Sequence, residues 1–416
     1  MRRTYFKLYA SAFLLDCAIM IGFTVVPFFI MRQLGGGARM LGMISAAQGA
    51  SYGLGSLISA RFVGRAKNGL NWARAGILGY AFLFCPAHLI REPYLYGLVS
   101  TLGAGCMAFV WPALWAWVGG EPDVKLRNRI IANYNVSWSV GLCVGPLFAG
   151  PLYKVAYGLP FLLIFFIAAA AFALVVRLPH EKAHFGGAST QVEQERAAHA
   201  EVSESHLHYA WFANMFGWLM AGACRSVYAK RVEQLAADDR LAVFGSGLFS
   251  GLTLTDAVLV FSALVFMINF SRMVLFYWMG RTHRWHHQFL PVIGFQLAAG
   301  AAVCWLGVTE SFIWMALCFT AVGVCNGFGF LVAVSYSLAD PALKHRRAAI
   351  NEAMVGLGGF AGAMGFGLFA GWFSVTMPFL WFPVVVAAAI AVEWLLFRHG
   401  VRRNRRVGPV LRPFDA

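Results

Sequence analysis

The feature that most constrains this chain is a succession of apolar runs, each long enough to cross a lipid bilayer as a helix. Such a helix needs about 20 apolar residues. Hydrophobic residues make up 60% of the 416 residues and charged residues only 12%, whereas a soluble domain carries about 25% charged residues. The pattern predicts an all-α integral membrane protein with twelve transmembrane helices. They cover residues 5–30, 40–60, 72–89, 94–118, 130–153, 159–176, 208–228, 256–280, 289–306, 311–338, 348–373 and 378–397.

Two stretches of the sequence follow the same plan. Residues 127–150 open with a basic cluster and then run apolar for a full crossing, with several glycines and Pro146, and residues 346–371 repeat the basic opening and the glycine-rich crossing. Arg129 lies 218 residues before Arg347, and the Leu-Phe-Ala-Gly sequence that ends the first stretch returns 221 residues later. This spacing predicts two pseudo-symmetric halves with the functional site between them.

A long polar stretch divides the predicted helices into six and six. We expect an N-terminal bundle over residues 1–176 and a C-terminal bundle over residues 208–397, joined by a cytoplasmic linker at 177–207. A short surface helix is predicted near 192–202 within this linker. A basic cytoplasmic tail is expected at 398–416.

Lysine and arginine set the predicted orientation, because the cytoplasmic loops of membrane proteins carry most of the positive charge. With the N-terminus inside, cytoplasmic segments hold 24 of the 33 Lys and Arg residues. Both termini are therefore expected in the cytoplasm, as in a multi-pass protein of a bacterial-type inner (plasma) membrane. The net charge of +15 is spread over short loops and not over one face of a domain, which argues against nucleic-acid binding.

Motifs for catalysis, metals and cofactors are missing from the sequence. The eight cysteines lie in apolar segments and form no CxxC pair, so we interpret them as packing residues. No Walker-type loop for ATP and no HExxH or GxSxG motif lies within the spans. We expect no cofactor, no metal and no enzyme activity, and nothing in the sequence requires more than a monomer.

Twelve helices arranged as six plus six, with a cytoplasmic linker after the sixth, resemble the major facilitator superfamily over essentially the whole chain. That family carries a Gly-x-x-x-Asp-Arg-x-Gly-Arg type of loop after its second helix. The residues found there in this chain are Gly55, Arg61, Gly64 and Arg65. The resemblance implies a gating loop at this place, although the acidic partner of the family's gating salt bridge is absent.

Gly141, Gly145 and Pro146 in the fifth predicted helix resemble a glycine motif of the family's antiporters. Small residues at a four-residue spacing let helix backbones approach closely, and Pro146 removes a backbone donor and permits a kink. We predict that this helix packs closely and moves during transport, with static close packing as the alternative. The resemblance implies alternating access to a site at the middle of the membrane.

Charged residues within the apolar runs point most directly to function, because an ionisable group in a bilayer is costly unless it is paired or hydrated. Asp16 in the first helix and Arg272 in the eighth lie at similar depths from the cytoplasmic side. We predict that they pair across a central cavity, where Asp16 binds a proton or a cationic group and Arg272 is its counter-charge or an anchor for an anionic solute. Asn269 lies one turn before Arg272 on the same face. Arg225 in the seventh helix lies either at the outer interface or at the mouth of this cavity.

Further polar and aromatic side chains are candidates for the lining of the cavity. They are Gln48, Trp111, Asn135, Trp138 and Asn326. Each can hydrogen-bond or stack on a solute, and a hydrogen bond or packing between helices is the alternative for each. Arg129 and Glu352 lie near the cytoplasmic ends of the fifth and eleventh helices and are candidates for conformational control. We expect Glu352 to form an interfacial ion pair with Arg346 or Arg347.

Together these features predict a secondary transporter that moves a small organic solute and is coupled to protons. The balance of two arginines against one aspartate within the spans favours an anionic or polyhydroxylated solute over a lipophilic cation. A multidrug-type proton antiporter is the first alternative, supported by the fifth-helix motif and by an aromatic content of 15%. A membrane sensor without transport and an intramembrane enzyme are the remaining alternatives.

Overall fold

The computed structural model describes residues 2–63, 68–119, 124–179, 190–243, 254–279, 281–282, 285–339 and 343–407. Regular secondary structure in these ranges is helical, apart from one isolated bridge between Ala242 and Ser311. Two residues of the expected gating loop, Gly64 and Arg65, lie outside the described residues. The predicted all-α fold is confirmed, and each predicted crossing coincides with one helix or with a run of consecutive helical elements.

The first half begins and ends with long helices, and its third and fourth crossings are assembled from shorter pieces. The elements are α1 (Arg2–Gln33), α2 (Ala38–Val63), α3 (Leu70–Gly79), the π-helical turn η1 (Tyr80–Phe84), the 3-10 turn η2 (Pro86–Leu89), α4 (Pro93–Cys106), the 3-10 turn η3 (Met107–Phe109), α5 (Val110–Gly119), α6 (Val124–Val155) and α7 (Leu159–Val176).

The second half starts with the longest helix of the described chain. The elements are α8 (Thr190–Ser226), α9 (Tyr228–Ala237), α10 (Ala257–Met279), α11 (Leu290–Leu306), α12 (Phe312–Ser337), α13 (Lys344–Trp372), α14 (Met377–Leu380) and α15 (Phe382–Val407). Helix α8 begins well before residue 208, so the short helix expected near 192–202 is continuous with the seventh crossing.

The length and composition of the helices agree with a membrane protein. Within the described ranges, eight helices are long and apolar enough to cross a bilayer. The other four predicted crossings fall on α2, α8, α11 and the run from α3 to η2. Of these, α11 is apolar but has only 17 residues.

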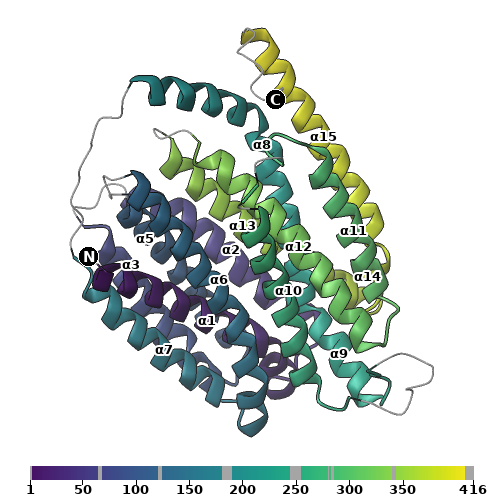
Figure 1. Cartoon of the computed structure of the whole chain (residues 1–416). Helices are drawn as coiled ribbons and strands as arrows, with labels where there is room; N and C mark the ends of the chain where they lie inside the picture. Colours follow the sequence, from purple (N-terminus) through teal and green to yellow (C-terminus); the bar gives the residue numbers. More distant parts are fainter. Residues whose placement is uncertain are drawn as a thin grey trace.

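The two halves lie side by side with their long helices running in the same general direction (Figure 1). Helices α1 to α7 occupy the lower left of the view, and α8 to α15 occupy the upper right. The described ends of the chain, at the start of α1 and the end of α15, both lie at the upper-left ends of the helices, whereas α9 lies at the opposite ends. An even number of crossings places both ends on one side in this way.

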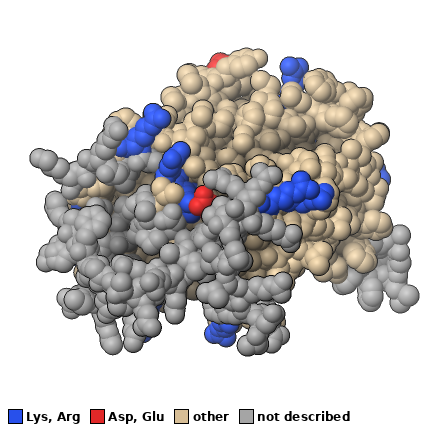
Figure 2. Space-filling model, turned by 90° about the horizontal axis from the view of Figure 1, so that it is seen from above, with Lys and Arg blue, Asp and Glu red and all other residues tan. Residues whose placement is uncertain are grey.

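The outer surface is largely apolar. In Figure 2 most of the coloured surface carries neither basic nor acidic side chains, and Lys and Arg appear in a few separate places. Large apolar side chains are exposed on helices from both halves, among them Leu54, Phe166, Trp278 and Leu395. Apolar patches of this extent are rare on soluble monomers and are stable against lipid chains.

Close backbone contact joins α2 to α13 across the two halves. A Cβ atom added to Gly49 would lie 2.8 Å from the backbone nitrogen of Phe360. A Cβ atom added to Gly356 would lie 2.5 Å from the Cα atom of Gly53. Only glycine leaves room for two helices at this separation, as is common between membrane helices. A second contact between the halves is formed by α6 and α10.

The repeat found in the sequence is also a repeat of contacts. Gly141 in α6 faces the backbone oxygen of Phe13 in α1. At the equivalent place in the second half, Gly362 in α13 faces the backbone oxygen of Leu219 in α8. The fifth crossing therefore packs on the first in the same way as the eleventh packs on the seventh. This equivalence confirms the predicted pseudo-symmetry.

Helix α6 uses small residues on two faces. Gly145 packs against the backbone of Cys17 in α1, and Gly150 packs against Ser262 in α10. The helix continues through Pro146 to Val155 without a break in its assignment. The predicted close packing of this helix is therefore present, and its movement remains a prediction.

Ion pairs join the two halves at the side where α9 lies. Arg32 at the end of α1 forms an ion pair with Glu233 of α9 at 2.8 Å. Lys154 at the end of α6 pairs with Asp256, just before α10, at 3.1 Å. These partly exposed pairs contribute little stability individually, but they connect the halves at one end of the molecule.

The α2–α13 contact predicts how glycine substitutions affect stability. Gly356→Ala places a methyl group against the backbone of Gly53, so we expect it to destabilise the protein by about 1–3 kcal/mol, the usual cost of overpacking. Gly365→Ala in the same helix is the matched control, because a Cβ atom there meets nothing within 4 Å. Thermal unfolding of the purified protein in detergent measures both. Equal melting temperatures would contradict the packing described here.

Candidate functional site

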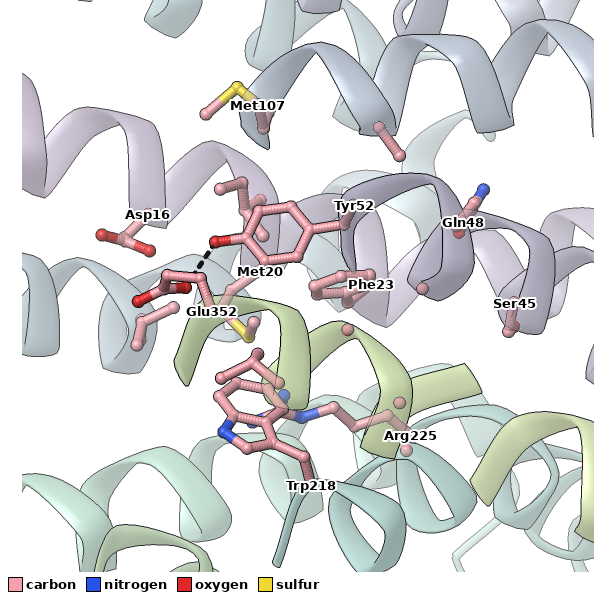
Figure 3. A pocket seen from close by; sticks show the side chains of 18 of the residues that line it. Asp16, Met20, Phe23, Ser45, Gln48, Tyr52, Met107, Trp218, Arg225 and Glu352 are labelled. Atoms are coloured by element: carbon pink, nitrogen blue, oxygen red, sulfur yellow. Dashed lines mark hydrogen bonds between the residues drawn. The ribbon is translucent and has the colours of Figure 1, made fainter. Parts of the chain in front are cut away.

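A cavity of about 230 Å³ lies between the two halves. Its walls come from α1, α2, α5 and α6 on one side and from α8, α10, α12 and α13 on the other. The close-up in Figure 3 shows labelled side chains of both halves pointing into the same space, including Tyr52 and Glu352. A site of this kind, formed by both halves, changes shape when the halves move relative to each other.

Two carboxyl groups, one from each half, lie on one side of the cavity (Figure 3). The hydroxyl of Tyr52 in α2 donates a hydrogen bond of 2.7 Å to Oε2 of Glu352 in α13, which links the halves inside the cavity. Asp16 is 8% exposed and has no hydrogen bond or ion pair with the described residues. Because a buried charge without a partner is costly, Asp16 is the acidic group of the cavity that most needs a proton or a cation.

Two buried arginines form a cluster around one amide. Nη2 of Arg225 and Nη2 of Arg272 both donate to the Oδ1 atom of Asn269, at 3.0 and 3.1 Å. Nη1 of Arg272 also donates to Oδ1 of Asn326 at 3.2 Å. Among the described residues neither arginine has an acidic partner within salt-bridge distance, although their exposed fractions are only 6% and 2%. The cluster therefore holds two positive charges whose hydrogen-bond partners, among the described residues, are neutral amides.

Tryptophan rings cover the guanidinium groups. The guanidinium carbon of Arg225 lies 5.3 Å from the ring centre of Trp218, and that of Arg272 lies 5.5 Å from the same ring. Arg272 also lies 5.7 Å from the ring centre of Trp138 in the first half. Cation–π contacts at these distances are favourable and leave the charges themselves in place. Trp138 is oriented by a hydrogen bond of 2.9 Å from its Nε1 to Oδ1 of Asn135.

The residues singled out from the sequence fall into two groups around this cavity. Those that line it are Asp16, Gln48, Trp111, Trp138, Arg225, Arg272 and Glu352. Those that hold lining residues by hydrogen bonds are Asn135, Asn269 and Asn326. Gln48 also donates to Ser100 at 3.2 Å, so its amide connects α2 to α4. The structure therefore brings these residues together, and their roles in transport remain predictions.

The expected ion pair of Glu352 with Arg346 or Arg347 is wrong for the described structure. Glu352 bonds to Tyr52, and Arg347 pairs with Glu204 at 3.5 Å. The reason is the helical rotation of about 100° per residue, which turns positions 347 and 352 to different faces of α13. Glu352 thus belongs to the cavity and not to the cytoplasmic interface.

The predicted direct pair between Asp16 and Arg272 is also not formed among the described contacts. Both residues line the cavity, but Arg272 directs its terminal nitrogens to Asn269 and Asn326. The two side chains therefore line a shared cavity without a direct bond between them.

The residues expected to act in gating are distributed differently. Gly55 packs α2 against Ala108, near the junction of η3 and α5. Arg61 and Arg129 are exposed near the ends of α2 and α6, away from the cavity lining. A gating role for these two arginines stays a prediction.

Sequence reasoning missed two residues that are central to the cavity, Tyr52 and Trp218. The equivalence of Tyr52 to Arg272 becomes visible only in the contacts of the structure. Gly105 packs on Ser51, and Gly323 packs on Ser271 in the same manner. This contact aligns position 51 with position 271 and therefore Tyr52 with Arg272. For Trp218 the sequence offered no signal, because tryptophans are frequent throughout the chain.

Comparisons with known proteins agree with this architecture. The family model described as Major Facilitator Superfamily matches residues 8–347. Among solved structures, a bacterial homolog of the human lysosomal transporter Spinster, in an inward-facing and unoccupied conformation, has a TM-score of 0.71 at 14% identity and covers 96% of this chain and 98% of its own. A search of curated protein sequences gave no significant match.

Two further solved structures share the fold at low sequence identity. A POT family transporter in complex with a thioalcohol-conjugated peptide has a TM-score of 0.71 at 12% identity, and each chain is covered to 96%. The nucleoside transporter NupG has a TM-score of 0.67 at 11% identity and covers 95% of this chain and 99% of its own. At such identities the likeness shows the fold, and the solutes named for those proteins are theirs.

The shared acceptor of the arginine cluster predicts the effect of removing it. Asn269→Leu keeps the side-chain size but removes the oxygen that accepts a hydrogen bond from each of two buried arginines. We therefore expect the free energy of unfolding to fall by about 2–3 kcal/mol. Asn135→Leu is the control, because it removes a bond between neutral groups and should cost about 1 kcal/mol. Unfolding in detergent by a chemical denaturant measures both. A smaller effect at position 269 than at 135 would be evidence against the cluster.

Proposed function

This chain belongs to the Major Facilitator Superfamily, and we propose that it is a proton-coupled transporter that moves a small organic solute through the cavity between its halves. As a member of this family it is a multi-pass membrane protein and a secondary transporter, and it is not an enzyme. The observation that carries the proposal is a cavity lined by one acidic side chain from each half and by two arginines of the second half.

Alternating access follows from a site that both halves share. The halves meet along glycine contacts between α2 and α13 and between α6 and α10. In this proposal the bundles rock about these contacts and expose the cavity first to one side of the membrane and then to the other. The ion pairs Arg32–Glu233 and Lys154–Asp256 close the side of α9 in one of these states and break in the other.

Proton coupling is assigned to Asp16, with Glu352 as a second acidic group. Asp16 has no partner among the described residues, so the charge that it carries depends on what enters the cavity. Glu352 is bonded across the halves to Tyr52, so a proton on Glu352 changes a contact between the bundles. Intramembrane acidic groups that change charge in this way are a common basis of proton relays.

The orientation and the division of the chain are part of the same proposal. Residues 1–176 and 208–397 act as the two moving bundles. The protein lies in a bacterial-type inner membrane, with both termini on the cytoplasmic side. The positive charge of the loops on that side supports this assignment. The protein acts as a monomer, since each chain forms a complete cavity.

A multidrug-type proton antiporter is the second candidate. The observation in its favour is the aromatic lining, which includes Trp111, Trp115, Trp138, Trp218 and Phe330. Lipophilic cations could stack on these rings and balance the charge of Asp16. In that case, cations and not anions would drive proton movement across the membrane.

Reconstituted protein tests the proposal directly. Proteoliposomes that contain a trapped pH-sensitive dye receive sugars, carboxylates, amino acids, nucleosides or lipophilic cations one at a time. We expect one class to move protons together with the solute, and we expect Asp16→Asn to abolish the proton movement while exchange of solute for solute continues. A carrier that loses only its proton-coupling group still exchanges solute for solute, because solute binding and the rocking of the bundles are intact.

The control for this experiment is Asp238→Asn, an exposed acidic position at the end of α9. It should leave the proton signal unchanged. Unaltered proton movement in Asp16→Asn would remove Asp16 from the mechanism, and transport of a solute without any proton signal would contradict proton coupling itself. A proton signal evoked only by lipophilic cations would establish the antiporter alternative.

A further inference from the structure

We propose that the solute is a small organic carboxylate, with its carboxylate group bound by Arg225 and Arg272 and its flat apolar body packed against Trp138 and Trp218. The assignment deepens the proposed function because it names the chemical class that the cavity accepts. It concerns binding, however, and binding can be measured without any transport.

The first argument is that no acidic side chain among the described residues forms an ion pair with either arginine. Among the described residues, the hydrogen bonds of Arg225 go only to Asn269, and its Nε atom is buried without any partner. Within the part of the chain that the structure describes, Arg272 donates hydrogen bonds only to Asn269 and Asn326. Two guanidinium groups that share a single acceptor oxygen repel each other, and a buried charge needs a counter-charge. An anion from outside supplies it.

The second argument is the geometry of the pair. Because both Nη2 atoms donate to the same Oδ1 atom of Asn269, the two guanidinium groups are close neighbours. Planar guanidinium groups present parallel N–H donors that match the two oxygens of a carboxylate. Asn269 and Asn326 already occupy one nitrogen of Arg225 and two of Arg272. Three of the ten N–H donors of the pair are used in this way, so the remaining donors can bind both oxygens of a carboxylate from two guanidinium groups at once.

The third argument is the shape and chemistry of the space beside the pair. Trp138 belongs to α6 in the first half and Trp218 to α8 in the second, and both rings lie within 6 Å of the Arg272 guanidinium group. The volume of about 230 Å³ is below the range of about 300–1,000 Å³ that is usual for sites of drug-sized ligands. A solute with a single flat ring fits, and it would contact both halves at once.

The acidic residues complete the charge balance. Asp16 and Glu352 line the same cavity as the two arginines, together with the hydroxyl-bearing Tyr52 and Tyr134. With both acidic groups protonated the cavity carries two positive charges, and one carboxylate neutralises half of this charge. Anion binding and protonation therefore favour each other, as reciprocal linkage requires. The carboxylate would then travel with protons and not against them.

Benzoate and benzamide form the matched pair of probes, since they share the ring and differ in charge. We expect benzoate to raise the melting temperature of the purified full-length protein and benzamide to have no effect at the same concentration. Phenyl phosphate and benzyltrimethylammonium test the other charge classes, and cyclohexanecarboxylate and butyrate test the need for a flat body. A ligand that binds only the folded state stabilises it by RT ln(1 + [L]/Kd), so the shift in melting temperature at equal concentration ranks the probes by affinity.

Variants locate the binding group. Arg225→Gln and Arg272→Gln should each weaken benzoate binding by about 10- to 100-fold, the range expected for a lost hydrogen bond to a charged group. Arg91→Gln is the control, because Arg91 is exposed and bonds to Gln33 and Tyr157 away from the cavity. If a glutamine variant fails to fold, Arg225→Lys and Arg272→Lys keep the charge and should weaken binding by losing the planar fork.

Every outcome decides the assignment. Selective stabilisation by benzoate that is weakened in the arginine variants supports it. Equal effects of benzoate and benzamide, a preference for phenyl phosphate or for benzyltrimethylammonium, no stabilisation by any carboxylate, or binding that survives both arginine substitutions would each overturn it. Stabilisation by cyclohexanecarboxylate or butyrate as strong as that by benzoate would overturn the flat body. Failure of the proposed proton-coupled transport can be distinguished from failure of the carboxylate assignment. If carboxylates bind but carry no protons in liposomes, only the coupling is wrong, and if another solute class moves protons, only the carboxylate is wrong.

Discussion

Close contact between helix backbones is the constraint on which the rest of this structure depends. In a bilayer the lipid chains are as apolar as the helix side chains, so helices associate through close packing and not through burial from water. Gly53 and Gly356 bring α2 into backbone contact with α13, and Gly150 brings α6 against α10. These contacts hold the halves together along two seams. Between the seams the larger side chains of the two halves leave the cavity open, and Asp16, Arg225, Arg272 and Glu352 line it.

Buried charge is the second constraint. It gives the cavity between the bundles the acidic and basic groups that a binding site needs. Two arginines and two carboxyl groups in an apolar interior are expensive unless each has a partner. Glu352 accepts a hydrogen bond from Tyr52, and the arginines share Asn269 as an acceptor. Asp16 and the guanidinium groups can still form further hydrogen bonds and ion pairs. A stable core would not retain such groups, whereas a carrier needs them because its solute and its protons complete the set.

The fold could be predicted from the sequence because membrane-spanning helices differ from other segments in their apolar composition. The sixth predicted crossing, for example, begins and ends at the same residues as α7. The start of α8 was missed because its first turns are polar and precede the membrane. Asp16, Arg225 and Arg272 stood out as charges within apolar runs. The partner of Glu352 was not predictable, because it depends on how α13 is rotated against α2, which is a property of packing. Tyr52 was hidden for the same reason, and its equivalence to Arg272 appears only in the matching contacts of Ser51 and Ser271.

The measurement that tests this account most directly is the number of protons that the protein takes up when the solute binds. Isothermal titration with benzoate in buffers of different ionisation enthalpy gives this number. The account predicts net proton uptake in the wild-type protein and its reduction in Asp16→Asn, because an anion in the cavity favours the protonated acidic groups. Benzoate binding that is accompanied by no proton exchange would contradict the claim that solute and proton share one site.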